Sequence, residues 1–165
     1  MIFQMSTLLT LDANAPIWPP GIPPLMVAIG AELTVTGVDG ERTVPAEDFF
    51  LGVYMTAAGP GELLTKITIP AGRSDGFASV PIGRDGTCIV NAAASVNGGA
   101  RLAIGCVDAV PVLLRTDSPE EEAVRAAVQG ASLDPPSDVH ASADYRRHLA
   151  EVVAVRAVAQ ARGKT

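Results

Sequence analysis

The side chains best suited to acid–base chemistry lie close together near the end of the chain. His140 and His148 are the only histidines, and Asp138 and Asp144 lie within a few residues of them. An imidazole beside a carboxylate can act as a general base. At the start of a helix, however, such a pair is typically a helix cap or a surface ion pair. We therefore assign these residues a structural role, with no catalytic residue and no metal ligand among them.

The remaining reactive groups form no catalytic or metal-binding motif. The sequence lacks a Gly-x-Ser-x-Gly elbow, a His-Glu-x-x-His motif and a Walker loop. Cys88 and Cys106 form no Cys-x-x-Cys pair for zinc or an iron–sulfur cluster, and both lie in apolar runs. We interpret them as buried free thiols. The segment Asn97-Gly98-Gly99 could cradle a phosphate, but between two alternating segments it predicts a hairpin turn instead.

The composition excludes several classes of protein. Of the 165 residues 48% are hydrophobic and 18% charged, so the chain can bury one ordinary core and is not disordered. Its 12 basic and 18 acidic residues give a net charge of −6 without a Lys/Arg cluster, which excludes a nucleic-acid partner. Residues 1–11 lack a signal-peptide pattern, and no apolar run is long enough for a membrane span. We expect a cytoplasmic protein.

Alternating residues predict a sheet that is followed by helices. After a proline-rich arm at residues 12–24, we expect a short helix at 24–29 that Gly30 ends, and a hairpin that joins 32–36 to 42–44. Further strands are expected at 62–70, 76–82, 87–96 and 101–107. Since two helices follow without βαβ alternation, the fold class is α+β: an antiparallel three- to four-stranded sheet with C-terminal helices packed on one face.

The first of the two C-terminal helices begins with a capping signal. Ser118 precedes Pro119 and Glu121, so its hydroxyl is expected to cap the helix while Glu121 reaches back. Val124, Ala127 and Val128 form its apolar stripe, and Gly130 ends it. We assign this helix a structural role only.

The last helix is longer and is expected to begin after Ser142, its N-cap. Its predicted buried face consists of Tyr145, Leu149, Val152 and Val153, and Gly163 ends the helix. We expect Tyr145, with Arg146 and Arg147, to hold the helix against the sheet or against a partner.

The strand at 62–70 carries one apolar side chain on its polar side. The alternation places Leu63, Thr65, Ile67 and Ile69 on one face and Leu64, Lys66 and Thr68 on the other. Leu64 is therefore the exception in this pattern.

Two ordered blocks of the chain resemble the flavin subunits of molybdenum hydroxylases, the family of carbon monoxide dehydrogenase and xanthine dehydrogenase. One block, at residues 138–150, is similar to the closing helix of these subunits. The other runs from Arg42-Thr43-Val44-Pro45-Ala46-Glu47-Asp48-Phe49-Phe50 to Gly61-Glu62-Leu63-Leu64-Thr65-Lys66-Ile67-Thr68-Ile69-Pro70. The resemblance extends over about residues 22–162.

The resemblance implies a division of the chain, a cofactor and partners. Residues 1–45 would be a remnant of the FAD-binding domain, with an extended arm, a short helix and a hairpin. Residues 46–165 would be the C-terminal domain of a carbon monoxide dehydrogenase-like flavoprotein. The implied function is that of an FAD-containing oxidoreductase subunit that passes electrons and docks to a molybdopterin-binding large subunit and an iron–sulfur small subunit. A separate chain could supply the glycine-rich FAD loops, which this sequence lacks.

The resemblance also implies one cofactor-binding residue. Leu64 falls where family members place an aliphatic side chain against the isoalloxazine ring. The alternative is that a helix or the upstream arm covers Leu64. The sequence departs from the family at Gly21, where an Asp is expected, and at 79–83, where a Lys or Glu followed by a pair of arginines is replaced. The alternative function is therefore a truncated, noncatalytic assembly module or remnant that binds no FAD.

Overall fold

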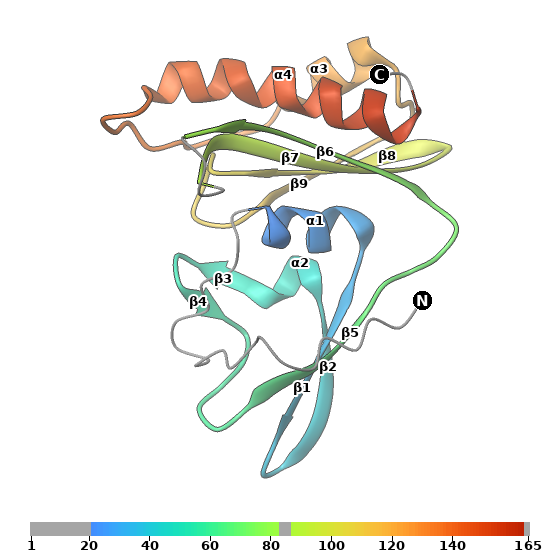
Figure 1. Cartoon of the computed structure of the whole chain (residues 1–165), viewed down its shortest axis with the longest axis vertical. Coiled ribbons are helices and arrows are strands. Elements are labelled where there is room, and N and C mark those ends of the chain that lie inside the picture. Colours follow the sequence, from blue (N-terminus) through green and yellow to red (C-terminus); the bar gives the residue numbers. More distant parts are fainter. Residues whose placement is uncertain (1–20, 83–86, 164–165) are drawn as a thin grey trace.

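The computed structural model describes residues 21–82 and 87–163, which form stacked layers. In Figure 1, α3 and α4 lie above a four-stranded sheet, α1 lies below it, and two smaller sheets follow beneath α1. The elements are α1 (Ile22–Ile29), β1 (Glu32–Gly37), β2 (Gly40–Pro45), α2 (Ala46–Phe49), β3 (Phe50–Gly52), β4 (Met55–Thr56), β5 (Leu63–Thr68), β6 (Ser74–Pro81), β7 (Cys88–Asn97), β8 (Gly99–Gly105), β9 (Val112–Thr116), α3 (Glu121–Gln129) and α4 (Ala143–Ala161). Within these two ranges no helix is long and apolar enough to cross a membrane. Most of the expected proline-rich arm, residues 12–20, lies outside the described residues.

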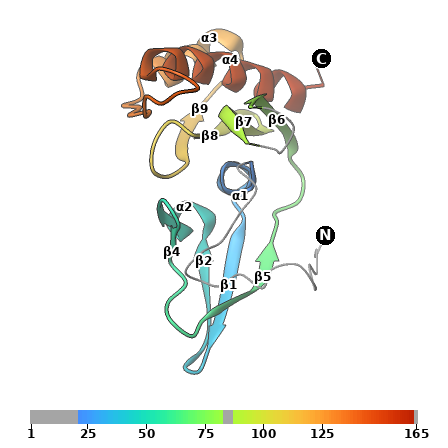
Figure 2. The same ribbon diagram turned by 60° about the vertical axis from the view of Figure 1, so that its left-hand side comes forward.

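The largest sheet has the order β6-β7-β8-β9, and each neighbouring pair is antiparallel. Residues 112–116 supply its fourth strand. The predicted hairpin turn is confirmed, because Asn97 pairs with Gly99 around Gly98, whose φ is 80°. The two C-terminal helices cover one face of this sheet (Figure 2). The predicted α+β fold class is therefore confirmed.

Helix α4 lies so close to β6 that only glycine fits at position 76. A Cβ atom on Gly76 would lie 2.1 Å from the carbonyl oxygen of Ala157 and 2.6 Å from the nitrogen of Ala161. The buried face of α4 consists mainly of small residues: Arg146, Leu149, Ala150, Val153, Ala154, Ala157, Val158 and Ala161. Small side chains and a glycine together let the helix and the sheet approach each other closely.

The N-cap prediction is confirmed for α4 and wrong for α3. Ser142 Oγ accepts a hydrogen bond from the Tyr145 N–H at 3.2 Å, as expected of an N-cap. Ser118 does not cap α3, which begins at Glu121; its Oγ accepts instead from the Glu120 N–H at 3.3 Å. The reason is that Glu120 has an extended backbone, with φ −75° and ψ 148°, so the helix starts two residues later than the capping box requires.

The prediction that Tyr145 is buried is also wrong. Tyr145 is 48% exposed, whereas its neighbour Arg146 is only 4% exposed and faces the sheet. Arg146 Nη1 donates to the carbonyl oxygen of Ile89, and Nη2 donates to Asp138 Oδ2 at 2.6 Å. These two acceptors make it possible to bury a guanidinium group in this interface.

Helix α1 covers the opposite face of the four-stranded sheet, which the sequence did not predict. Ala93 of β7 and Ala103 of β8 are buried beneath it and join its side chains in a second core cluster. The predicted end of the helix is confirmed, because Gly30 adopts a left-handed conformation with φ 67°. The sheet is thus covered by helices on both faces.

The three-stranded sheet has the order β2-β1-β5 and contains the predicted hairpin of β1 and β2. Thr34 pairs with Lys66 and the next residue, Val35, pairs with Leu64, so Thr65 is an extra residue in β5. This bulge reverses the faces of the residues before it, so that Leu64 packs on the same core side as Ile67. Leu63 is 61% exposed, while Leu64 is half-buried against the second core cluster. The predicted placement of these two leucines was therefore wrong.

Candidate functional site

An ion pair between Arg42 and Glu62 holds the start of β5. It joins the two segments, 42–50 and 61–70, of one of the sequence blocks that resemble the flavin subunits. Arg42 Nε donates to Glu62 Oε1 at 2.8 Å, and Arg42 Nη2 donates to Glu62 Oε2 at 2.6 Å. The same Nη2 donates to the carbonyl oxygen of Ala57 at 2.6 Å, and the Gly59 N–H donates to Glu62 Oε2 at 2.6 Å. The hydrogen bonds from Arg42 and then from Gly59 lower the pKa of Glu62 to about 2. This network fixes the place at which β5 begins.

Leu64, the predicted flavin contact, lies two residues after this ion pair. It pairs with Val35 across the sheet, and its half-buried side chain packs against the core cluster formed by α1 and β1. The chain itself therefore covers part of Leu64, and only the remaining aliphatic surface could meet a ligand. Leu63 presents a more exposed aliphatic surface on the same strand. The contact between Leu64 and a flavin ring stays a prediction.

Gly21 lies at the N-terminus of α1, against the ring of Phe77. A Cβ atom on Gly21 would lie 2.7 Å from Phe77 Cζ. Any side chain at position 21 would therefore require the Phe77 ring, which is 38% exposed, to move. The Phe77 ring can therefore occupy its position only because Gly21 stands where the resemblance implies an Asp.

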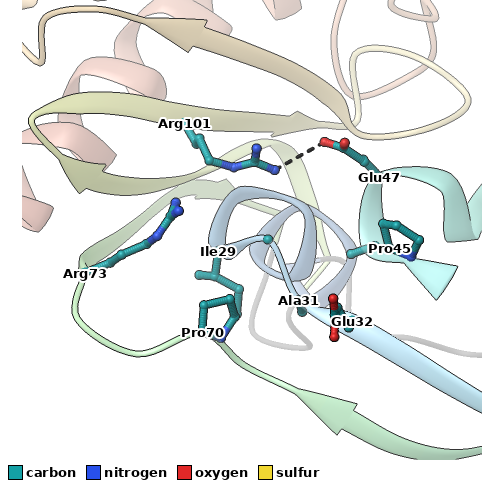
Figure 3. Close-up of a pocket in the computed structure, with 10 residues that line it drawn as sticks. Ile29, Ala31, Glu32, Pro45, Glu47, Pro70, Arg73 and Arg101 are labelled. Carbon is teal, nitrogen blue, oxygen red and sulfur yellow. Dashed lines mark hydrogen bonds and ion pairs between the residues drawn. The ribbon is translucent and has the colours of Figure 1, made fainter. Parts of the chain in front are cut away.

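A hollow of about 230 Å³ opens at the C-terminal end of α1, between the four-stranded sheet and α2. Figure 3 shows Arg73 and Arg101 extending toward it, and Glu47 of α2 forms an ion pair with Arg101 at 3.2 Å. Arg101 also donates to the carbonyl oxygens of Val27 and Ala28, at 3.1 and 3.3 Å, and so complements the negative end of the helix dipole. Leu64 is not among the lining residues, so the structure does not bring the predicted flavin contact to this hollow.

Asp138, in the turn before α4, has the structural role predicted for it. Asp138 Oδ1 accepts from the backbone N–H groups of His140 and Ala141, at 2.9 and 3.0 Å. These hydrogen bonds, with a smaller contribution from Arg146, lower the pKa of Asp138. His140 and His148 are both exposed. The carboxylate therefore organises the turn before α4.

The two cysteines lie side by side, which their separation in sequence did not indicate. Their Sγ atoms are 3.9 Å apart, and both are free thiols. The hydrogen bond from Cys106 lowers the pKa of the Cys88 thiol to about 7, and the Asn91 amide adds to this effect at 2.9 Å. The same pairing raises the pKa of Cys106. The described residues contain no group of three or more His, Cys, Asp or Glu side chains that could hold a metal ion.

Comparison with known proteins relates the chain to flavin-binding subunits. Residues 14–72 match the sequence family described as the FAD binding domain in molybdopterin dehydrogenase. The chain is 33% identical to the carbon monoxide dehydrogenase medium chain of Afipia carboxidovorans over 175 residues, which cover 94% of this chain and 61% of the relative. It is 30% identical to the nicotine 6-hydroxylase medium subunit of Paenarthrobacter nicotinovorans over 160 residues, which cover 87% of this chain and 56% of that subunit.

Solved structures agree with the sequence matches. The reconstituted carbon monoxide dehydrogenase from Oligotropha carboxidovorans superposes with a TM-score of 0.78 at 30% identity, covering 93% of this chain and 59% of the other. Quinoline 2-oxidoreductase from Pseudomonas putida 86 gives a TM-score of 0.75 at 27% identity, with coverages of 92% and 59%. The chain is therefore related to the FAD-binding subunits of molybdenum hydroxylases. Within that class it is similar to the medium chains of carbon monoxide dehydrogenases, and it spans 54–61% of the length of its curated relatives.

Proposed function

We propose that this chain forms part of an FAD-containing electron-transfer subunit of a molybdenum hydroxylase and completes its flavin site. The observation that carries the proposal is the match of residues 14–72 to an FAD-binding domain of molybdopterin dehydrogenases. The chemistry that FAD supplies in such a subunit is the acceptance and release of electrons. The role of the residues of this chain is to bind the flavin ring, orient it and exclude water from it.

The position of β5 supports a role for Leu64 as one wall of the flavin site. The Arg42–Glu62 ion pair fixes the start of the strand, and the bulge at Thr65 fixes the direction in which Leu64 points. An aliphatic side chain held in this way can pack on a flavin ring and keep water away from it. Arg42 and Glu62 would then act as positioning residues.

The described residues fit a wall for the flavin ring but not a cradle for its pyrophosphate. Such a cradle needs several backbone N–H groups at a glycine-rich turn or a helix N-terminus. The paired glycines Gly98 and Gly99 are used in the hairpin between β7 and β8. We therefore infer that the backbone amides for the pyrophosphate come from another part of the protein or from a separate chain.

We further propose docking to an iron–sulfur subunit and a molybdopterin-binding subunit, in a cytoplasmic complex. The names of the relatives support this proposal, because they are medium chains or medium subunits of larger enzymes. The hairpin of β3 and β4 also supports it, since its side chains Leu51, Val53, Tyr54 and Met55 are 56–71% exposed. Exposed apolar side chains gathered in one place are typical of an interaction surface.

A second candidate function is a noncatalytic assembly module that keeps the fold and the docking surface but binds no FAD. The arrangement of Gly21 and Phe77 favours it, because the Phe77 ring fills the space next to position 21, where the resemblance implies an Asp. The two candidates make opposite predictions about flavin in the purified protein.

The test compares flavin retention in the purified native protein that contains this chain. If Leu64 is a wall of the flavin site, Leu64→Asp abolishes flavin retention, because a buried carboxylate without a partner is strongly unfavourable. Leu64→Met keeps an apolar side chain and is expected to retain the flavin. The measurement is the ratio of flavin absorbance to protein after gel filtration.

Leu63→Asp is the matched control, since it places the same carboxylate on the adjacent, more exposed position of β5. We expect it to retain flavin, and circular dichroism should show that all three variants are folded. Equal flavin content in the wild type and Leu64→Asp would contradict the assignment of Leu64. A wild type without flavin would favour the assembly module.

A further inference from the structure

A second hollow, of about 260 Å³, lies beside the β7–β8 hairpin on the α1 side of the four-stranded sheet. Its polar lining residues are Arg73, Ser95, Asn97, Arg101, Arg115 and Thr116, and we call it the arginine hollow. It shares Arg73 and Arg101 with the hollow drawn in Figure 3. The segment Asn97-Gly98-Gly99 makes a turn as predicted, yet it also contributes to the wall of this hollow.

The register of the sheet brings the central lining residues together. Ser95 pairs with Arg101 across β7 and β8, and Arg101 pairs with Arg115 across β8 and β9. Side chains two positions apart on a strand point to the same face. Since Ala93 and Ala103 are buried beneath α1, the row of Ser95, Arg101 and Arg115 emerges on that same face next to the helix.

The arginine hollow is positively charged in a protein whose net charge is −6. Arg101 and Arg115 face each other directly across two strands, an arrangement that is unfavourable without an anion between them. Glu47 Oε2 partly satisfies both, at 3.2 and 2.7 Å, but it supplies a single negative charge. Arg73 has no ion-pair partner in the described part of the chain, and no carboxylate lines the hollow. The excess charge is therefore positive.

Ser95 adds an unused hydroxyl group to this charged surface. It is 1% exposed, and its Oγ has no hydrogen-bond partner among the described residues. A buried hydroxyl without a partner is unfavourable, and a water molecule or an ion is one of the partners that can satisfy such a group. Ser95 lines the hollow and lies in the same cross-strand row as Arg101 and Arg115, which places its hydroxyl next to a group that would bind there.

We propose that the arginine hollow binds a phosphate group. A phosphate has several strong acceptor oxygens and about two negative charges, which match the guanidinium groups of Arg73 and Arg115 and the hydroxyl of Ser95. The phosphate could be a free ion or part of a nucleotide. The site uses side chains, and is therefore distinct from the backbone cradle that a flavin pyrophosphate requires.

The test is an NMR chemical-shift titration of the isotope-labelled chain, at constant ionic strength, with inorganic phosphate, pyrophosphate and ADP in separate experiments. We expect saturable shifts at Ser95 and Arg115, with a dissociation constant of about 1 mM for at least one of the three. Arg73→Gln is expected to weaken binding by about tenfold. Ser95→Ala is expected to weaken phosphate binding as well, because it removes the hydroxyl that donates to the phosphate and changes little else.

Arg156→Gln is the matched control, since it removes the same charge from an exposed position on α4, across the sheet from the hollow. If it leaves the affinity unchanged, the effect of Arg73→Gln is local. Tighter binding of ADP than of phosphate, with the same dependence on Arg73, would identify a nucleotide as the source; equal binding would identify the free ion. The proposal is overturned if none of the three saturates below about 10 mM, or if Arg73→Gln and Arg156→Gln have equal effects.

Discussion

Arg146 shows how a single charged residue can hold a helix against a sheet. Its guanidinium group connects α4 to the carbonyl oxygen of Ile89 in β7 and to Asp138 in the preceding turn. Tyr145, which the apolar pattern favoured for this role, faces solvent. The buried position is occupied by a long polar side chain because acceptors are present there.

We therefore predict that Arg146→Ala lowers the free energy of unfolding by roughly 3 kcal/mol, since it removes packing and leaves the Ile89 carbonyl without this donor. Tyr145→Ala should change it by only about 0.5 kcal/mol. Urea denaturation followed by circular dichroism measures both. A larger loss in Tyr145→Ala than in Arg146→Ala would contradict the observed orientation of α4.

Glu62 makes the free energy of unfolding depend on pH in the acid range. Its pKa is lowered from an ordinary value of 4.5 to about 2 in the folded protein. The stabilisation by the Arg42–Glu62 pair is thus fully present above pH 4.5 and is lost as the pH falls from there toward about 2. We predict that Glu62→Gln makes stability fall less steeply with pH in this window.

The measurement for Glu62 is a series of urea denaturations between neutral pH and about pH 2. Glu41→Gln is the control, because Glu41 is exposed and its side chain has no ion-pair partner among the described residues. It should follow the wild-type pH profile. Parallel profiles for the wild type and Glu62→Gln would show that the ion pair does not lower the pKa.

At the scale of elements, the contact between β6 and α4 depends on the absence of a side chain at Gly76. Since a Cβ there would lie within 2.1–2.6 Å of the backbone of α4, neither a rotamer change nor a side-chain shift can relieve the overlap. The helix itself must move away from the sheet.

We predict that Gly76→Ala destabilises the protein by roughly 3 kcal/mol. Gly52→Ala is the matched control: its Cβ would lie 3.8 Å from the nearest atoms, those of Met55, and it should change stability by less than about 1 kcal/mol. Thermal denaturation compares the two variants with the wild type. Similar melting temperatures for Gly76→Ala and Gly52→Ala would mean that α4 lies farther from β6 than the structure shows.

At the scale of the whole molecule, one sheet connects both cores. Ala92 and Ala94 of β7 belong to the core beneath α3 and α4, whereas Ala93 belongs to the core around α1. The boundary predicted between residues 45 and 46 stays a prediction, and the matched FAD-binding family runs across it, through residue 72. The two continuous cores lead us to expect that the 165 residues fold together.

We predict that the polypeptide of these 165 residues does not bind FAD tightly by itself. Burial of one leucine contributes roughly 2 kcal/mol, whereas a micromolar dissociation constant requires about 8 kcal/mol. Leu64 contributes less than this because its own core already covers part of it. Fluorescence titration of the folded chain tests the prediction; a dissociation constant at or below about 1 μM would contradict it.

The sequence by itself determined the features that depend on neighbouring residues. Periodicity and turn residues were sufficient for β6, β7 and β8, the β7–β8 hairpin, the stop at Gly30 and the cap at Ser142, because each follows from a local pattern. They did not predict β9, and β5, which was expected beside β6, lies in the three-stranded sheet instead. The resemblance carried by the blocks at 42–70 and 138–150 was sufficient for the family, which the comparisons confirm.

Only the tertiary structure decided the features that depend on distant residues. The bulge at Thr65 depends on pairing with β1, about 30 positions earlier, and it changes which leucine of β5 is buried. The burial of Arg146 depends on Ile89, and the arginine hollow depends on the register of three strands. Such contacts leave no local period in the sequence, because each residue acquires its partner only when the chain has folded.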